Sequence, residues 1–146
     1  RAALARGLRV EAIPGACALI AALSTSGLPS DEFHFAGFLP HKSGQRRRVL
    51  EGLAQVRGTL AFYESPYRVT KILEELHALW PLRPVVLMRE LTKKFEERLA
   101  GTPSELLTRL QNRALKGEFV VLVGPDAGEV REPREDSTED AANASS

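Results

Sequence analysis

The sequence has few of the residues that build disulfides and metal centres: its 146 residues include one cysteine and three histidines. Cys17 alone cannot close an internal disulfide or form a cysteine metal cluster, which suits a reducing, cytoplasmic compartment. His34, His41 and His77 match no metal-ligand spacing, so no metal site is expected. No apolar run approaches the roughly 20 residues that cross a membrane, so no membrane association is expected.

Complete catalytic signatures are also lacking. The chain has no Ser-His-Asp arrangement, no pair of carboxylates at a recognisable spacing and no glycine-rich Walker or Rossmann loop. It begins RAALARGLRV, without Met, in a stretch that reads as the last turns of a helix. We therefore expect the natural N-terminus to lie upstream.

Neither sign of charge dominates: 20 Lys and Arg oppose 19 Asp and Glu, a net charge of +1. This balance excludes a wholly basic, histone-like chain. The charges are unevenly spread, because residues 129–146 hold six acids and two bases, a net −4, which leaves +5 for residues 1–128. The sequence predicts a moderately basic domain followed by an acidic, disordered tail over residues 126–146.

Hydrophobic periodicity predicts strands that alternate with helices. The segment 33–38 alternates and is aromatic, as in a strand, and residues 102–105 form a capping box that opens a helix. The expected strands are 8–13, 33–38, 59–63, 84–88, 95–99 and 118–123, and the expected helices are 16–26, 45–55, 66–79 and 103–113. This order predicts an α/β fold, and its two consecutive strands predict antiparallel pairing within a mixed sheet.

The turn at Pro14-Gly15 is the first candidate site. It lies between an expected strand and an expected helix, so it presents free N–H groups at a helix N-terminus, which suits an anion or a polar ligand edge. The small residues that follow let a ligand approach closely. An ordinary tight turn is the alternative, and inert packing is the alternative for Cys17.

A basic run is the second candidate. Lys42, Arg46, Arg47 and Arg48 lie in LPHKSGQRRR, which contains no acid. Cations at a helix start oppose the macrodipole, so helix stability does not explain them, whereas a phosphate backbone would. A solvated loop and helix face is the alternative.

Polar and aromatic residues follow two strands of buried type. Glu64 and Arg68 follow the first, either paired or holding a ligand, and Tyr63 and Tyr67 offer stacking faces and hydroxyls. Ser65-Pro66 there also reads as a helix start. In open α/β sheets, ligands bind at the carboxyl ends of strands.

The segment RELTKKFEE (89–97) follows the second strand. Dense charge beside a buried strand predicts that Arg89 and Glu90 are partly buried, and hence paired or bound to a ligand. A structural ion pair with a solvated loop is the alternative.

Taken in order, five segments resemble the C-terminal half of a known family. They are IPGACALIAALSTSGLPSDEFHFAGFLPHK, TLAFYESPYR, VVLMRELTKKFEE, GTPSELL and KGEFVVLV. The family is that of the 16S ribosomal RNA cytidine 2′-O-ribose methyltransferases, within the tetrapyrrole methylase superfamily. The IPG-x-x-A turn is shared across the superfamily, whereas FYES-x-x-R and RELTK-x-x-E are more specific to this family.

The resemblance implies a two-domain enzyme that binds S-adenosylmethionine in the cleft between its domains. Here it implies the mixed-sheet C-terminal subdomain of the tetrapyrrole methylase fold, with the N-terminal domain missing. Residues 1–7 would end the last helix of that domain, and residues 8–125 would form the C-terminal domain. The expected cofactor contacts are Pro14, Gly15, Ala16, Cys17, Ala18, Ser65, Leu91 and Thr92.

Methyl transfer to a ribose hydroxyl needs positioning and removal of the hydroxyl proton. Glu64, Glu90 and Lys93 are the candidate catalytic residues. The implied partner is 16S rRNA in the small ribosomal subunit, and the superfamily implies a homodimer. The expected RNA contacts are Lys42, Arg46, Arg47, Arg48, Tyr63, Tyr67, Arg68 and Lys94, with the tyrosines stacking on a splayed base.

Two other interpretations stay open at this point. One is an α/β RNA-binding module without catalysis, because no complete active site is present. The other is a superfamily methylase that acts on a small molecule, against which the basic run at 42–48 argues. As an rRNA methyltransferase, this chain alone is expected to be poorly active, because half of the cofactor cleft would be absent.

Overall fold

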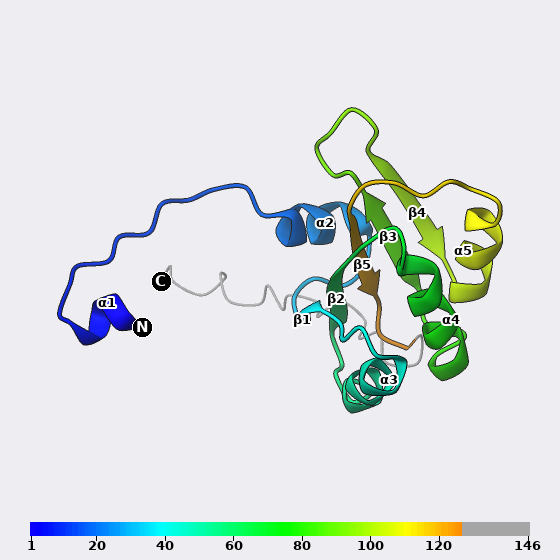
Figure 1. Cartoon of the computed structure of the whole chain (residues 1–146), viewed down its shortest axis with the longest axis horizontal. Coiled ribbons are helices and arrows are strands. Elements are labelled where there is room, and N and C mark those ends of the chain that lie inside the picture. The colour runs from blue at the N-terminus through cyan, green and yellow to red at the C-terminus, as the bar shows by residue number, and fades with distance from the viewer. Residues whose placement is uncertain (127–146) are drawn as a thin grey trace, which may run out of the picture.

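A computed structural model describes residues 1–126 as helices packed on a mixed β-sheet (Figure 1). The bounds of its elements, in chain order, are α1 (Ala2–Ala5), α2 (Ala18–Ser26), β1 (Phe33–Phe38), α3 (Ser43–Gly52), β2 (Thr59–Glu64), α4 (Val69–Leu79), β3 (Val85–Arg89), β4 (Glu97–Gly101), α5 (Pro103–Leu110) and β5 (Phe119–Val123). The predicted α/β class and mixed sheet are confirmed. Of the tail predicted over 126–146, only Asp126 lies within the described residues.

The five strands lie in the order β1-β2-β5-β3-β4. β1 is parallel to β2, whereas β5 runs antiparallel to both β2 and β3. β1, β2 and β3 therefore share one direction, and β4 pairs antiparallel with β3 as the sequence predicts. Consequently the carboxyl ends of β1, β2 and β3 meet the amino ends of β4 and β5 at one edge of the sheet.

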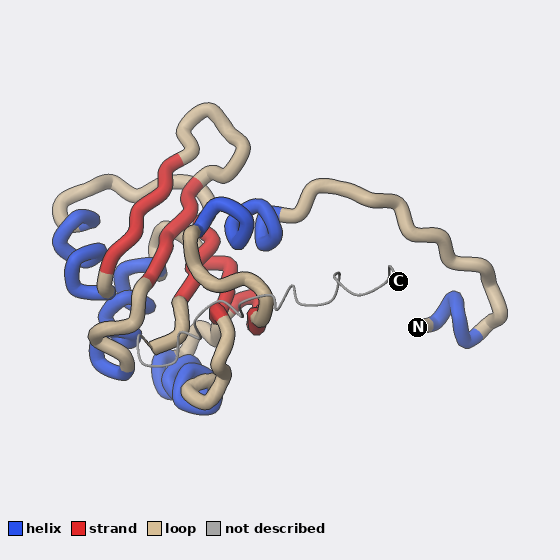
Figure 2. The backbone as a smooth tube through the Cα atoms, turned by 180° about the vertical axis from the view of Figure 1, so that it is seen from behind, coloured by secondary structure: helices blue, strands red, loops and turns tan. Residues whose placement is uncertain are grey.

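The sheet is covered on both faces. Leu60 and Phe62 point toward α3, α4 and α5, whereas the alternate residues Ala61 and Tyr63 point toward α2. The central strand β5 is buried along its whole length, which explains its uninterrupted apolar sequence. Figure 2 shows the same arrangement from behind, with α2 alone on its face of the sheet.

Two strand predictions need correction. Residues 8–13 form no strand: this segment is exposed and runs away from the sheet, and α1 before it buries no residue (Figure 1). Its apolar residues find no neighbouring strand among the described residues, so they have no ladder to join. The strand predicted at 95–99 begins two residues later, at Glu97, which leaves Phe95 in the loop before it.

The start of α4 also differs from the prediction. Its N-cap is Arg68 and not Ser65. The Ser65 carbonyl accepts from the N–H groups of Arg68 and Val69, both at 3.1 Å, so Ser65 closes a turn that precedes the helix. The buried stripe of Val69, Ile72, Leu73 and Leu76 is as predicted.

The capping box of α5 gives a direct stability test. The Glu105 N–H donates to the Thr102 hydroxyl at 3.4 Å, and the Thr102 N–H donates to Glu105 Oε2 at 2.7 Å. Thr102→Ala is expected to cost about 1 kcal/mol in the free energy of unfolding, measured in urea. Thr108→Ala, in the same helix, is the control and should cost nothing, because alanine is the better helix former. Equal effects of the two variants would contradict the cap assignment.

Candidate active site

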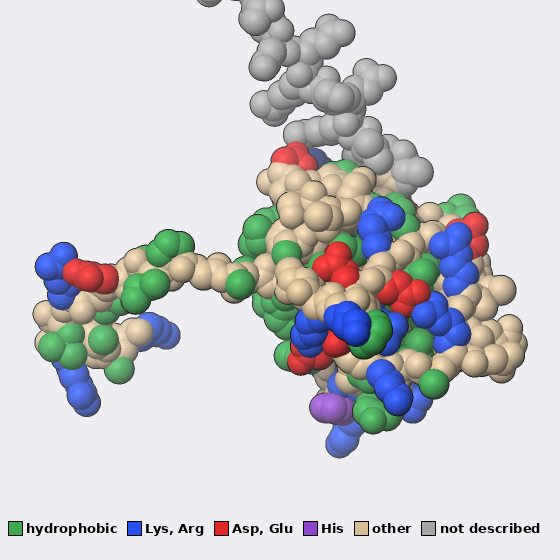
Figure 3. Space-filling view, turned by 90° about the horizontal axis from the view of Figure 1, so that it is seen from above, with side chains coloured by type: hydrophobic (Ala, Val, Ile, Leu, Met, Phe, Trp, Pro, Cys, Tyr) green, Lys and Arg blue, Asp and Glu red, His purple; other side chains and the backbone are tan. Residues whose placement is uncertain are grey.

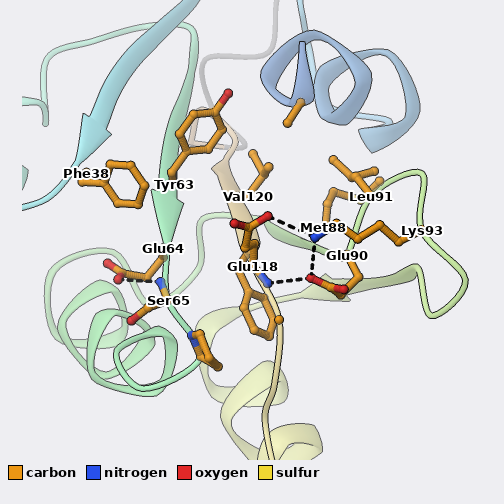
Figure 4. Close-up of a pocket in the computed structure, with 14 residues that line it drawn as sticks. Phe38, Tyr63, Glu64, Ser65, Met88, Glu90, Leu91, Lys93, Glu118 and Val120 are labelled. Carbon is orange, nitrogen blue, oxygen red and sulfur yellow. Dashed lines mark hydrogen bonds and ion pairs between the residues drawn. The ribbon is translucent and has the colours of Figure 1, made fainter. Parts of the chain in front are cut away.

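A pocket of about 430 Å³ opens at the edge where the strand ends meet (Figure 4). Phe38, Glu64 and Glu90 contribute side chains from the ends of β1, β2 and β3, and Glu118 contributes from the start of β5. Met88 and Val120 form part of its apolar wall on the α2 side. The volume lies within the range of small-molecule sites, and apolar walls with a few convergent polar groups are typical of them.

Glu90 is held at the mouth of this pocket by an unusual backbone. Its φ is 49° and that of Thr92 is 63°, both in the left-handed region that non-glycine residues rarely adopt. Glu90 Oε1 accepts from Lys93 Nζ at 3.0 Å and from the Glu118 N–H at 2.9 Å. No donor from residues 1–126 binds Oε2, so one carboxylate oxygen is anchored and the other is free to accept a proton from a ligand.

These contacts shift the pKa values of Glu90 and Lys93 in opposite directions. Hydrogen bonds from the Glu118 N–H and from the Lys93 ammonium lower the pKa of Glu90 below its usual value. Hydrogen bonds to the Glu90 and Glu118 carboxylates raise the pKa of Lys93. At neutral pH Glu90 is ionised and Lys93 is protonated. These directions favour Glu90 over Lys93 as a proton acceptor, and Lys93 contacts the Glu90 and Glu118 carboxylates as a cation.

Gly117 makes the position of Glu90 possible. Its φ is 87°, and a Cβ built on it would lie 2.5 Å from the Glu90 carboxyl group. The backbone conformation favours glycine, and a side chain here would also displace the Glu90 carboxylate.

Gly117→Ala is expected to lower the free energy of unfolding by about 2 kcal/mol or more, because it adds left-handed strain to a steric clash. Urea denaturation would measure this loss. Gly44→Ala is the matched control, since a Cβ at Gly44 meets nothing within 4 Å and the residue lies inside α3. That variant should be neutral or gain up to about 1 kcal/mol. Unfolding of Gly117→Ala at the parental midpoint would contradict the assignment.

Glu64 is buried at the end of β2 and connects the pocket to the β1–α3 loop. Its Oε1 accepts from the Ser65 N–H at 2.8 Å, and its Oε2 lies 3.2 Å from Arg68 Nη2. Arg68 in turn donates to the carbonyls of Leu39 and Pro40 and contacts His41 Nδ1 at 3.1 Å. The pairing of Glu64 with Arg68 is one of the two arrangements that the sequence predicts.

The basic run divides into two kinds of residue. Arg46 is only 4% exposed, and its guanidinium binds both oxygens of Glu75 and the carbonyls of Pro40 and His41. The Glu75 carboxylate raises the pKa of Arg46 further. Arg46 and Arg68 thus hold the β1–α3 loop in place, and their cations are already compensated within the fold.

Arg47 is exposed and pairs with Glu51 at 2.8 Å. Lys42 and Arg48 are exposed and have no carboxylate partner within residues 1–126. Seen from above, the end of the molecule that carries the pocket shows Lys and Arg side by side with Asp and Glu (Figure 3).

The expected cofactor contacts are only partly brought together. Ala18, Ser65 and Leu91 line the pocket, whereas the segment 14–17 lies exposed in the approach to α2. Thr92 sits beside the pocket, where its N–H donates to Glu96 Oε2 at 2.5 Å. Tyr63 lines the pocket, and Tyr67 and Lys94 are exposed near its rim.

Several pocket residues were not predicted from the sequence. Phe38 is the last residue of β1, and its ring centroid lies 5.7 Å from that of Tyr63. Glu118 lies between Gly117 and the first residue of β5. The strand directions place both at this edge, so knowledge of the topology, added to their position at strand ends, would have found them.

Within residues 1–126, no group of three or more His, Cys, Asp or Glu side chains is arranged to hold a metal ion. In the same part of the chain, no helix has the length and apolar character needed to cross a bilayer.

The fold and pocket define a mixed α/β domain with an open pocket where the carboxyl ends of β1, β2 and β3 meet. A family model described as Tetrapyrrole (Corrin/Porphyrin) Methylases matches residues 1–107. The chain belongs to this family, which confirms the fold that the resemblance implied.

Curated relatives narrow the comparison. Ribosomal RNA small subunit methyltransferase I of Xylella fastidiosa is 47% identical over 141 residues, which cover 92% of this chain and 52% of the relative. The proteins of the same name from Erythrobacter litoralis and Vibrio cholerae are each 49% identical, over 81% and 88% of this chain and 42% and 46% of their own lengths. The chain therefore spans about half the length of the curated relatives it matches.

Solved structures share the fold at lower identity. The methyltransferase CobJ aligns with a TM-score of 0.59 and 22% identity, over 83% of this chain and 53% of that one. Uroporphyrin-III C-methyltransferase from Thermus thermophilus, solved with S-adenyl homocysteine, aligns with a TM-score of 0.52 and 23% identity, over 82% and 55%. At these identities the likeness concerns the fold alone.

Proposed function

We propose that this chain is the C-terminal part of an S-adenosylmethionine-dependent methyltransferase that acts on small-subunit ribosomal RNA. The observation that carries the proposal is the pocket that Glu64, Glu90 and Lys93 line at the ends of two strands. The names of relatives that are 47–49% identical support the substrate class. In this proposal the chain supplies one wall of the active site. The part of the relatives that this chain does not cover supplies the other wall.

The pocket fits the cofactor in chemical terms. S-adenosylmethionine combines an aromatic adenine ring, a polar ribose and an amino-acid chain with a positively charged sulfonium. Met88, Leu91 and Val120 offer apolar contacts, and the ionised Glu90 offers a counter-charge. Ala18, the first residue of α2, lines the pocket, and no side chain caps the N-terminus of this helix among the described residues. When bound, the cofactor supplies an electrophilic methyl group.

The residues of this chain would position the acceptor and take its proton. We propose Glu90 as the proton acceptor, because Oε1 is anchored and Oε2 is free. Lys93 keeps that carboxylate oriented, and Phe38 and Tyr63 offer faces against which a base can lie. Methyl transfer is an in-line displacement, so this positioning provides much of the catalysis.

The finer proposal is that the acceptor is the 2′-hydroxyl of a cytidine in 16S rRNA, which the family resemblance implies. The exposed cations Lys42, Arg47, Arg48 and Lys94 would meet phosphates, and Tyr67 would contact a base. Arg46 and Arg68 would act on RNA only by holding the β1–α3 loop.

The proposal also includes a cytoplasmic homodimer, for which exposed Phe33 and Phe35 on β1 provide an apolar face.

A chimera tests the proposal. The N-terminal half of the Erythrobacter litoralis relative would be joined ahead of this chain, and transfer of labelled methyl groups to small ribosomal subunits would be measured. The chimera is expected to methylate a cytidine ribose, and this chain alone is not. Methylation of a small tetrapyrrole in place of RNA would overturn the substrate class. Equal activity of the chain alone would overturn the division of the site between two halves.

A further inference from the structure

The β3–β4 loop, residues 90–96, projects beyond the sheet at the edge that carries the pocket (Figures 1 and 2). Phe95 lies in this loop and is 68% exposed. Lys94 Nζ lies 5.5 Å from the centre of its ring. The loop therefore presents an aromatic face and a cation together to solvent.

Internal bonds order this loop. Within its backbone, Lys93 N–H donates to the Glu90 carbonyl at 3.0 Å and Glu96 N–H donates to the Lys93 carbonyl at 3.1 Å. Two side chains add further hydrogen bonds. The Glu96 carboxylate accepts from the Thr92 N–H, and the Lys93 ammonium donates to the carboxylates of Glu90 and Glu118. The phenyl ring is thus held out by a pre-organised loop, which reduces the entropy lost when a ligand stacks on it.

Its place beside the pocket indicates what it meets. Lys93 lines the pocket and Phe95 lies two residues farther along the same loop. A single strand that places one nucleotide in the pocket can therefore reach this tip with an adjacent nucleotide. Aromatic rings that stack on unpaired bases, with cations for the phosphates, are the usual means of binding single-stranded RNA.

We propose that Phe95 stacks on an unpaired base next to the target nucleotide while Lys94 contacts its phosphate. This inference rests on the proposed function, because it assumes an RNA substrate. The sequence placed Phe95 in an expected strand and did not suggest this role for it. A single exposed hydrophobic residue is ordinary in itself. Here the aromatic ring, the adjacent cation, the ordered loop and the neighbouring pocket occur together.

Equilibrium binding of a fluorescein-labelled, unstructured RNA of about 12 nucleotides to the full chain tests the proposal. Phe95→Leu keeps an apolar side chain but loses the ring face, so affinity should fall about five-fold or more, as for Phe95→Ala. Phe95→Trp should keep the affinity, and RNA should quench the added tryptophan fluorescence. Lys94→Gln should lower the slope of log affinity against log salt by about one.

Leu82 provides the matched control. It is 80% exposed but lies before β3, at the opposite edge of the sheet. Leu82→Ala should leave the affinity unchanged, and RNA should not quench the fluorescence of Leu82→Trp.

Parental affinity in Phe95→Leu, or equal quenching at both tryptophans, would overturn this inference while leaving the proposed function in place. Dissociation of a dimer by Phe95→Ala, measured by sedimentation, would assign the ring to a second copy of the chain and would also overturn it. Absence of RNA binding by the parental chain would overturn the inference, whereas the proposed function would still be decided by methyl transfer in the chimera.

Discussion

Arg46→Ala is expected to lower the free energy of unfolding by about 3 kcal/mol, because it removes one partner of a buried ion pair. The variant leaves Glu75 without the two donors that lie 2.5 and 2.7 Å from its oxygens. It also removes the donor to the His41 carbonyl and one of the two donors to the Pro40 carbonyl, which loosens the β1–α3 loop. Urea denaturation monitored by circular dichroism would measure the loss.

Arg47→Ala is the matched control for this loss. Arg47 lies next to Arg46 in α3, but its pair with Glu51 is exposed, so its removal should cost less than about 0.5 kcal/mol. The double variant Arg46→Met, Glu75→Leu should recover most of the stability, because apolar side chains replace both charges. Equal effects of the two single variants would show that Arg46 is a surface cation, as the sequence alone suggested.

Local signals were sufficient for most of the fold. The stripe of α4 and the apolar run of β5 depend on burial, which residue type and spacing report directly. The capping box at Thr102 depends on contacts within four residues, and it forms as predicted. The antiparallel pairing of β3 and β4 follows from the short connection between two strands.

Signals that depend on distant neighbours gave the errors. Residues 8–13 alternate like a strand, but a strand needs a partner ladder, and no described segment pairs with them. Ser65-Pro66 resembles a helix start, yet the chain makes an extra turn there before Arg68 caps α4. In each case the local pattern was real and the tertiary context decided the outcome.

The same distinction between local signals and distant neighbours explains which residues of the candidate site the sequence predicted. Glu64, Glu90 and Lys93 were found because charged residues after buried strands collect at one edge of the sheet. Arg46 was grouped with RNA contacts because its partner Glu75 lies 29 residues away, on another helix. Phe38 and Glu118 were missed because only the order and direction of the strands bring them to this edge.

Glu90→Gln is expected to reduce the kcat of methyl transfer by the chimera about 100-fold or more, because glutamine cannot accept the hydroxyl proton. The variant keeps an oxygen that can accept from the Glu118 N–H, so the pocket should retain its shape.

The pKa of Glu90 is lowered, so ionised Glu90 stabilises the fold above its usual pKa of 4.5, and this contribution is lost as the pH falls through the lowered value. The parent should therefore unfold at higher urea than Glu90→Gln at neutral pH, and the difference should vanish in acid.

Glu118→Gln separates proton transfer from the loss of a charge near Lys93. Glu118 also pairs with Lys93, at 3.1 Å, but its side chain is exposed and its N–H to Glu90 is a backbone group that survives the substitution. If Glu90 is the acceptor, Glu118→Gln should lower kcat only a few-fold, because the orienting contacts on Glu90 Oε1 remain. A kcat preserved in Glu90→Gln and lost in Glu64→Gln would instead assign the proton to Glu64. The Arg68 guanidinium would then lie beside the reacting oxygen, because Glu64 Oε2 is 3.2 Å from Arg68 Nη2 and forms no hydrogen bond with the described residues.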